Sequence, residues 1–311
     1  MLARRFTTPE ARALFAGAAA HAVRPLSAPF TSAIGLALGA SAHRYGWPVA
    51  EGGSESISRA IVGLLRDLGG RVETGVEVTS LDQVADADVV LLDVAPGAAA
   101  RIIGDRLPAR VRKAYEGYRH GPGSFKIDLA VEGDVPWSHP ESRVAGTVHV
   151  GGTLAEVAHA EREVDRGRLP ARPFVLVGQQ HLADPGRSRD GVHPVYAYAH
   201  VPAGWDGDPA QAREALLGQV ERFAPGFRER VVAEHVTTPR DWERLDANFV
   251  GGDVVTGANT VRQLLLRPRP ALDPYRTGVD GVLLCSAATP PGAGAHGMCG
   301  WNAAHSALRR L

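Results

Sequence analysis

Cysteine is scarce in this 311-residue sequence, which contains only Cys285 and Cys299 and no CxxC pair. Such sparse usage is typical of a protein that folds in a reducing compartment, so we expect a cytoplasmic location. The twelve histidines show neither an HExxH motif nor another paired-ligand spacing. The sequence therefore predicts no metal site.

An excess of charge is also missing, because lysine plus arginine and aspartate plus glutamate both number 34. This balance gives no attraction for nucleic acid, and no pattern of an RNA- or DNA-binding module is present. The sequence contains no GxSxG nucleophile elbow and no P-loop, which argues against a serine hydrolase and a P-loop nucleotidase.

Long apolar runs are absent as well. Residues 31–42 are apolar, but a transmembrane helix needs about 20 such residues. We expect this segment to pack against a larger body. The alternatives are that it lines an apolar substrate channel or makes a peripheral membrane contact.

The most informative stretch is residues 280–311. Residues 282–285 form a short apolar run that predicts a buried strand, and prolines and glycines between residues 290 and 294 interrupt regular structure. From Gly297 the spacing of apolar residues predicts a helix with a basic end at Arg309 and Arg310. A strand, a glycine turn and a helix N-terminus in this order leave backbone N–H groups open to an anion or an electron-rich ring edge.

The turn contains Gly292-x-Gly294-x-x-Gly297, which matches the glycine fingerprint of dinucleotide-binding folds. The full fingerprint also needs a second strand after the helix and an acidic residue about 20 positions further on. Only residues 298–311 follow, enough for one helix. We interpret the segment as a strand–turn–helix unit that touches a cofactor, and a plain glycine turn is the alternative.

Residues 289–300 (TPPGAGAHGMCG) resemble the C-terminal flavin-contacting signature of phytoene-desaturase-like FAD-dependent oxidoreductases, part of the amine-oxidase-like flavoproteins. Three further segments are similar to the same family: GWPVAEGG at 46–53 with GGRV at 69–72, YRHGPGSFKID at 118–128, and NFVGGD at 248–253. The resemblance covers nearly the whole chain, from about Pro9 onward.

The resemblance implies an FAD cofactor and hydride transfer from an apolar substrate to the flavin, with reoxidation by oxygen, a quinone or another acceptor. It also implies that Gly52 and Gly53 lie near the flavin ring and that Val78 lies beside the adenine. Without the resemblance, the glycine pair is a hinge or tight turn and Val78 is a core residue. The residues that the resemblance places at the flavin in the C-terminal turn are Gly292, Ala293, Gly294, His296, Gly297 and Met298.

Other side chains have two interpretations each, and no catalytic residue is assigned. Lys126 and Asp128 share a strand face, where a lysine could polarise a flavin-bound water or the two could form a surface ion pair. His296 could donate to the flavin or a substrate, or bond to the backbone. Four further side chains could either line a pocket or pack within the sheet: Tyr196, Tyr198, His200 and Trp205.

The residue patterns predict two kinds of sheet. In residues 45–95 a helix from Ser54 to the Gly69–Gly70 pair precedes an alternating segment at 71–81, read as one or two strands, and a central strand at 87–94, which implies a parallel sheet. Alternation in 125–131, 174–180 and 195–201 predicts an antiparallel sheet. The fold class is therefore α/β (α+β), an incomplete FAD-binding Rossmann-like domain with an inserted antiparallel-sheet substrate domain.

We expect four segments along the chain. Residues 1–44 are a helical part of the substrate domain, 45–95 a part of the FAD domain, 96–248 the substrate domain, and 249–311 the C-terminal part of the FAD domain.

The family begins with a βαβ unit whose own glycine fingerprint binds the FAD pyrophosphate, and no such unit precedes Met1. The chain thus resembles the C-terminal two thirds of a member. Three explanations stay open: a truncated copy that is inactive alone, a split enzyme whose partner chain supplies the unit, and a non-catalytic binding or scaffold subunit. A strand edge left uncovered would seek a partner, including a second copy of the chain.

Overall fold

The computed structural model describes residues 2–309, so the predicted basic helix end at Arg310 lies outside the described residues. The chain divides into two compact units. The first comprises the residues up to Thr74 together with Pro122–Asp241. The second comprises Gly75–Gly121 and the residues from Trp242 onward.

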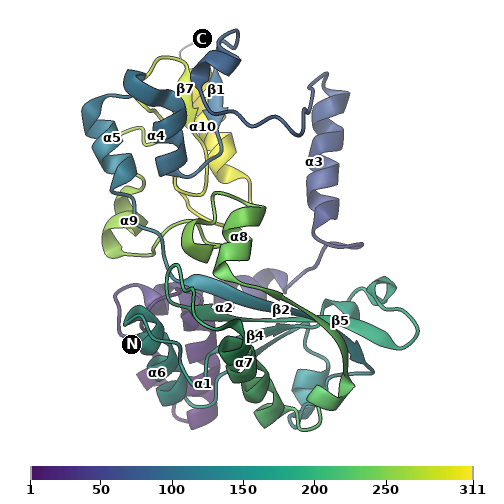
Figure 1. Ribbon diagram of the computed structural model, residues 1–311. Coiled ribbons are helices and arrows are strands. Elements are labelled where there is room, and N and C mark those ends of the chain that lie inside the picture. The colour runs from purple at the N-terminus through teal and green to yellow at the C-terminus, as the bar shows by residue number, and fades with distance from the viewer. Residues whose placement is uncertain (1, 310–311) are drawn as a thin grey trace. The chain divides into compact units, whose positions relative to one another are not determined.

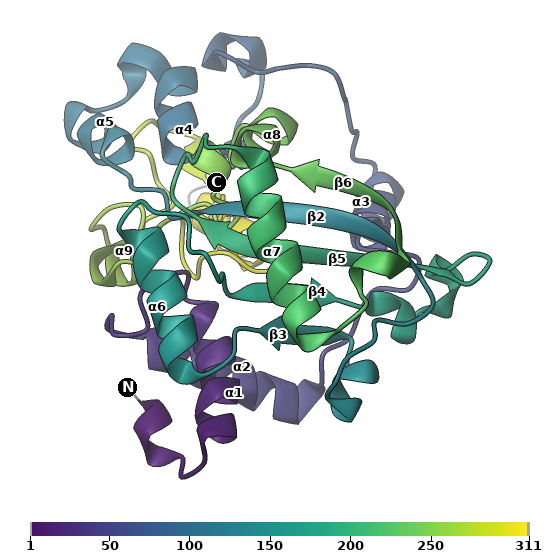
Figure 2. The same cartoon turned by 60° about the horizontal axis from the view of Figure 1, so that its bottom comes forward.

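The first unit is built on a five-stranded antiparallel sheet with the strand order β3-β4-β5-β2-β6 (Figures 1 and 2). The two long central strands pair from Gly123↔Val201 to Glu132↔Val192. The strands are β2 (Gly123–Glu132), β3 (Thr147–Val150), β4 (Val175–Gly178), β5 (Val192–Val201) and β6 (Val231–Thr237). This sheet confirms the predicted mixed fold with an antiparallel sheet.

One face of this sheet forms the core of the unit. Side chains of β2 alternate between buried and half-buried, as a strand with one covered face requires. The buried set, which includes Phe125 and Ile127, packs against Leu216 and Val220 of helix α7 (Pro209–Phe223), and Figure 2 shows α7 lying across the sheet. Removing this apolar surface from water stabilises the unit.

Three helices pack at the β3 end of the sheet. Helix α1 (Pro9–Ala20) begins where the Thr8 hydroxyl accepts from Ala11 N, and α6 (Leu154–Asp165) begins with a capping box between Thr153 and Glu156. Helix α2 (Thr31–Tyr45) packs closely on α1, because Gly35 lies against the backbone of Ala19. The predicted packing of residues 31–42 against a larger body is thus found. No helix among residues 2–309 has the length and apolarity needed to cross a bilayer.

Helix α3 (Glu55–Asp67) is amphipathic, yet none of its residues is buried. Ile57, Ile61 and Leu64 on its apolar face are all exposed. The predicted strands at 71–81 are wrong: residues 71–79 form no strand, and only a short 3₁₀ helix (Leu81–Val84) follows. An alternating segment becomes a strand only when a neighbour takes up its backbone hydrogen bonds, and no described segment pairs with it.

The second unit contains a two-stranded parallel sheet of β1 (Val90–Leu92) and β7 (Val282–Leu284). Both predicted strands exist, but β1 is not central, because β7 is its one partner among the described residues. Leu92, Leu284 and Ile103 belong to the buried core of this unit. The helices are α4 (Pro96–Ile103), α5 (Ala109–Glu116), α8 (Pro239–Leu245), which begins in the first unit, α9 (Val261–Leu266) and the predicted C-terminal helix α10 (Met298–Leu308).

Three histidines lie close together in the first unit, one of them buried and the other two half-buried. The Nε2 atoms of His21, which directly follows α1, and His149 on β3 lie 2.9 Å apart, and His200 on β5 contacts the Glu161 carboxylate at 2.9 Å. The ring of Phe174 lies between His149 and His200. The aromatic and histidine side chains on this face of the sheet therefore serve packing at the α1 and α6 end.

The contact between α1 and α2 predicts that alanine substitutions at two glycines of α2 have different effects on stability. A Cβ at Gly35 would lie 3.0 Å from Ala19 Cα, whereas a Cβ at Gly39 would meet nothing within 4 Å. We expect Gly39→Ala to raise the free energy of unfolding by about 0.5–1 kcal/mol through helix propensity. Gly35→Ala should be about 1–3 kcal/mol less stable than Gly39→Ala because it overpacks the contact. Urea unfolding of both variants tests this, and equal stabilities would contradict the close packing.

The histidines at this end of the sheet predict loss of stability in acid. Burial, with a smaller effect of His200, lowers the pKa of His21 to about 4, and burial together with His21 lowers that of His149 to about 4. The unfolded chain therefore binds more protons between pH 6.5 and 4, and the free energy of unfolding falls as the pH drops through this window. At His200 burial is outweighed by Glu161, which raises the pKa, so its stabilising contribution is lost only above pH 6.5.

Urea unfolding at a series of pH values measures this effect. The expected loss is on the order of 3 kcal/mol for one such histidine. Replacing both His21 and His149 by Gln should flatten the curve between pH 6.5 and 4, and an unchanged slope would show that other groups control acid stability.

Candidate functional site

The parallel strands of the second unit end at one edge, where a cavity of about 190 Å³ opens. Cys285 N donates to Leu92 O at 2.9 Å, so the chain leaves both strands side by side. Ligands of α/β sheets bind at this carboxyl edge. The lining residues are Asp93, Ala95, Asp246, Asn248, Phe249, Thr256, Ser286, Ala287 and Ala288. Burial, and then the neighbouring Asp246, raise the pKa of Asp93, so this pocket disfavours the ionised form of Asp93.

The glycine turn after β7 adopts a backbone that side chains would block. Gly292 has φ +109°, and a Cβ on it would lie 2.7 Å from Nη1 of Arg267. Gly294 has φ +156°, and a Cβ there would lie 2.7 Å from the ring of His296. Both positions therefore require glycine, and the backbone from Ala293 to Gly297 is exposed. A ligand can approach this backbone directly.

His296 forms a hydrogen bond with the backbone, which is one of the two interpretations that the sequence allows. Its Nδ1 accepts from Met298 N at 3.0 Å, so the ring takes up an N–H at the start of α10. The imidazole and Met298 are both exposed beside the turn. Below the turn, the Cys299 thiol lies 3.4 Å from the carbonyl oxygen of Gly292. The turn is thus held from both ends before any ligand binds.

Arg267 lies directly beneath the turn and was not identified from the sequence. The residue is 3% exposed. Its Nε donates to Gln263 O at 3.0 Å and its Nη1 to Ala287 O at 3.2 Å, while Nη2 is 3.4 Å from Asn259 Oδ1. All three acceptors are neutral, so none of them offsets the positive charge of the guanidinium. Buried cations usually have an anionic partner, and an anionic or electron-rich ligand on the turn would supply one.

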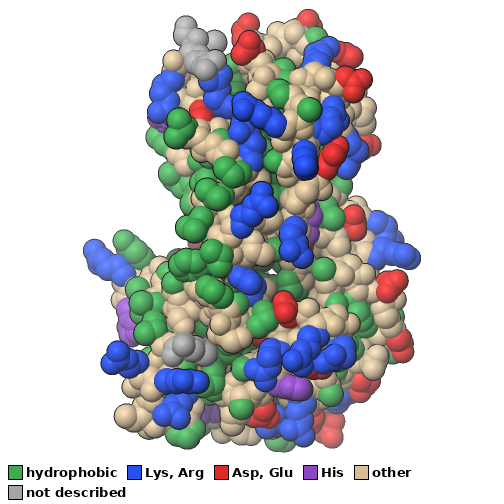
Figure 3. Space-filling view, turned by 90° about the vertical axis from the view of Figure 1, so that its left-hand side faces the viewer, with side chains coloured by type: hydrophobic (Ala, Val, Ile, Leu, Met, Phe, Trp, Pro, Cys, Tyr) green, Lys and Arg blue, Asp and Glu red, His purple; other side chains and the backbone are tan. Residues whose placement is uncertain are grey.

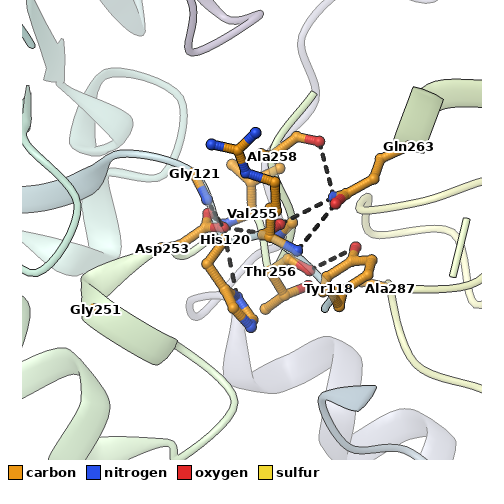
Figure 4. A network of polar contacts seen from close by, with 12 residues as sticks. Tyr118, His120, Gly121, Gly251, Asp253, Val255, Thr256, Ala258, Gln263 and Ala287 are labelled. Atoms are coloured by element: carbon orange, nitrogen blue, oxygen red, sulfur yellow. Dashed lines mark hydrogen bonds and ion pairs between the residues drawn. The ribbon is translucent and has the colours of Figure 1, made fainter. Parts of the chain in front are cut away.

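Two segments that resemble the family, at 118–128 and 248–253, meet in the second unit around the Asp253 carboxylate (Figure 4). Asp253 is 1% exposed. Its Oδ2 accepts from Gly121 N at 2.7 Å and Gly257 N at 2.8 Å, and its Oδ1 accepts from Val255 N at 3.0 Å. His120 Nδ1 lies 3.8 Å away. Burial lowers the pKa of His120 despite the opposing effect of Asp253. Three backbone N–H groups donate to the Asp253 carboxylate.

Gln263 extends the network around Asp253 toward Arg267. Its Oε1 accepts from Arg119 N at 3.0 Å, and its Nε2 donates to Arg119 O at 2.9 Å and Ala258 O at 3.1 Å. The Gln263 carbonyl in turn accepts from Arg267. The position of the guanidinium under the turn therefore depends on residues far away in sequence.

The first unit contains a separate cavity of about 460 Å³ that includes Lys126 and Asp128 in its wall. Lys126 Nζ lies 2.7 Å from Asp128 Oδ1 and 5.4 Å from the centre of the Tyr196 ring. The ion pair of the second interpretation is therefore present, and it lies at a cavity. Tyr196 lines the cavity, whereas Trp205 packs edge-on against Phe125 in the core.

The predicted pair Gly52 and Gly53 belongs to the turn beside this cavity. Gly52 N donates to Asp184 Oδ2 at 2.8 Å, and Arg187 bonds both Asp184 (2.9 Å) and the Ala50 carbonyl (2.6 Å). Ala50 and Arg187 line the cavity. The structure thus places Gly52 and Gly53 in the first unit, and the C-terminal turn and Val78 in the second. Val78 lies in the unpaired 71–79 segment, half-buried.

The structure brings together one group of candidate metal ligands that the sequence analysis did not identify. Asp134, His181 and His193 have ligand atoms within 4.8 Å of one another, the one such group among residues 2–309. The residues are far apart in sequence, so no spacing motif reveals them. Two ligand atoms about 2.1 Å from one ion lie at most about 4.2 Å apart. The group as it stands therefore assigns no metal.

No protein-family model matches the chain. The chain is similar to pyridine nucleotide-disulfide oxidoreductase domain-containing protein 2 of Rattus norvegicus, with 29% identity over 204 residues, 60% of this chain and 35% of that protein. It is also similar to lycopene-forming phytoene desaturase of Pseudescherichia vulneris, with 27% identity over 297 residues, 87% of this chain and 58% of that protein. The chain therefore spans only part of both relatives.

Among solved structures, an oxidoreductase from Methanosarcina mazei aligns with 99% of this chain and 66% of its own chain, at a TM-score of 0.59 and 16% identity. This likeness concerns the fold. The phytoene desaturase match confirms the resemblance to phytoene-desaturase-like oxidoreductases that the motifs indicate.

The geometry of the turn predicts opposite effects at two glycines. Gly292→Ala would force a φ of +109° on alanine and push its Cβ against Arg267, which should cost about 1–3 kcal/mol of stability. A Cβ on Gly300 in α10 would meet nothing within 4 Å, so Gly300→Ala should stabilise by about 0.5–1 kcal/mol. Chemical denaturation compares the two, and a harmless Gly292→Ala would disprove the constraint on the turn.

Proposed function

We propose that this chain provides the flavin-contacting turn and the substrate-side sheet of an FAD-dependent oxidoreductase that removes hydride from an apolar substrate. The observation that carries the proposal is the exposed backbone from Ala293 to Gly297, next to the buried cation Arg267. A Cβ at Gly292 or Gly294 would clash, and among residues 2–309 Arg267 donates only to neutral acceptors. The residues therefore fit a planar, electron-rich ring with a polar edge.

The bound FAD would supply the hydride acceptor, with N5 taking the hydride from a substrate C–H bond and oxygen, a quinone or another acceptor taking up the electrons afterwards. The N-terminus of α10 and Arg267 would stabilise the negative charge that develops on the ring. The turn residues from Gly292 to Met298 would orient the ring. This chemistry needs no protein acid or base, so no residue is assigned a catalytic role.

An apolar substrate is supported by the first unit. Phe30, Leu36, Tyr45 and Trp47, in and beside α2, are exposed large apolar or aromatic side chains. The neighbouring segment from Pro48 to Ala50 lines the 460 Å³ cavity that Gly52 and Gly53 border. We extend the proposal to a cytoplasmic protein whose α2 surface makes a peripheral membrane contact, from which an apolar substrate could enter.

The proposal includes a partner segment that carries the glycine-fingerprint βαβ unit. Helix α3 buries no residue, and the strand-patterned residues 71–79 find no neighbour among the described residues. Each of these surfaces matches what an added α/β segment would cover. The second candidate function follows from the same surfaces: a truncated or split family member that is inactive alone and acts as a binding or scaffold subunit, including as a homo-oligomer.

A flavin titration tests the proposal, with tryptophan quenching and flavin fluorescence as the measured signals. The chain is titrated with FAD alone and again with a polypeptide that carries a glycine-fingerprint βαβ unit. We expect saturable binding in at least the second titration. Arg267→Met should weaken it about tenfold because a charge-assisted contact is lost. Arg101→Gln on α4 is the charge-matched control that should leave affinity unchanged.

Binding only in the presence of the partner unit would identify a split enzyme. Absence of saturable binding in both titrations would refute the oxidoreductase function and favour the scaffold. If Arg267→Met leaves the FAD affinity unchanged, the flavin does not bind at the turn.

A further inference from the structure

A second cavity of the second unit, of about 870 Å³, lies between α5 and the segment around α9. Four of its lining side chains are basic and none is acidic: Arg110, Lys113, Arg262 and Arg269. The volume falls in the range of small-molecule sites, about 300–1,000 Å³. Figure 3 shows basic side chains gathered on the face that carries α5 and α9.

These four cations are not neutralised by the protein. None of them forms an ion pair with a carboxylate among residues 2–309. Arg269 donates instead to the carbonyl of Arg276 at 2.7 Å. Arg213, by contrast, is paired with Glu234. The whole chain has a formal net charge of zero, so the cluster does not reflect a general excess of basic residues.

The four positive charges repel one another unless an anion lies between them. Arg110 and Lys113 are three residues apart on α5, where like charges repel. Arg262 and Arg269 add two further cations at the same cavity. Small residues between them, Ala114, Gly117 and Ala271, leave the space open.

We propose that this cavity binds an anion with at least two negative charges carried by phosphate groups. Guanidinium groups match phosphate oxygens in pairs, and a lysine adds a point charge. No residue of the 289–300 turn lines the cavity, so the site is separate from the proposed flavin contact. Leu272 at the rim is exposed. The phosphate can belong to a free phosphate ester or to an anionic lipid headgroup.

Calorimetric titration with inorganic pyrophosphate tests the proposal without any flavin. We expect one site per chain whose affinity falls with rising salt, because the contacts are electrostatic. Lys113→Gln and Arg262→Gln change exposed side chains, and each should weaken binding about tenfold. Arg101→Gln, an exposed arginine of α4 outside the cavity, should leave the affinity unchanged.

Vesicle sedimentation separates the two sources. Binding to vesicles that contain phosphatidic acid, whose phosphate monoester can carry two negative charges, but not to pure phosphatidylcholine, lost in Lys113→Gln and in Leu272→Ser, would identify a lipid headgroup. Pyrophosphate binding without vesicle binding would identify a soluble phosphate ester. The proposal is overturned if neither pyrophosphate nor anionic vesicles bind, or if binding survives both Lys113→Gln and Arg262→Gln unchanged.

Discussion

The buried carboxylate of Asp253 is the constraint on which the second unit depends. It accepts three backbone N–H groups from the segments at 121 and 255–257, which are far apart in sequence. A buried carboxylate is costly unless such donors satisfy it, so the two segments are fixed to each other once it is enclosed. Through Gln263 the same network sets the position of Arg267, and thereby the charge below the glycine turn. The candidate flavin contact is thus built on polar contacts between distant segments.

Local patterns predicted much of the fold. The antiparallel sheet, the strand at 282–284, the glycine turn and the helix from Met298 follow from alternation, breakers and three- or four-residue spacing, which the nearest neighbours in sequence enforce. Residues 71–79 have the pattern of a strand without forming one. A pattern records a surface that favours burial, but pairing needs a second segment, and the sequence of one segment does not show whether it is present.

Of the candidate flavin contact, only the glycine turn was predictable from the sequence. The glycine positions were identified because their spacing matches a known fingerprint and a family signature, and Gly292 has a positive φ that favours glycine. Arg267 leaves no comparable signal, since it is one of many arginines and its function depends on burial beneath the turn. The four cations of the 870 Å³ cavity come from three separate elements, so only the folded chain shows that they lie together without carboxylate partners. The same holds for Asp134, His181 and His193.

Hydrogen exchange of the chain with and without FAD, in the presence of the βαβ partner unit, tests the central claim most directly because it reports where the flavin contacts the backbone. The account predicts that FAD slows exchange in the turn from Ala293 to Cys299 and in the 263–267 segment that carries Arg267. It predicts no comparable protection at the α5–α9 cavity. Protection confined to other segments, with the turn exchanging at its original rate, would contradict the assignment of the glycine turn as the flavin contact.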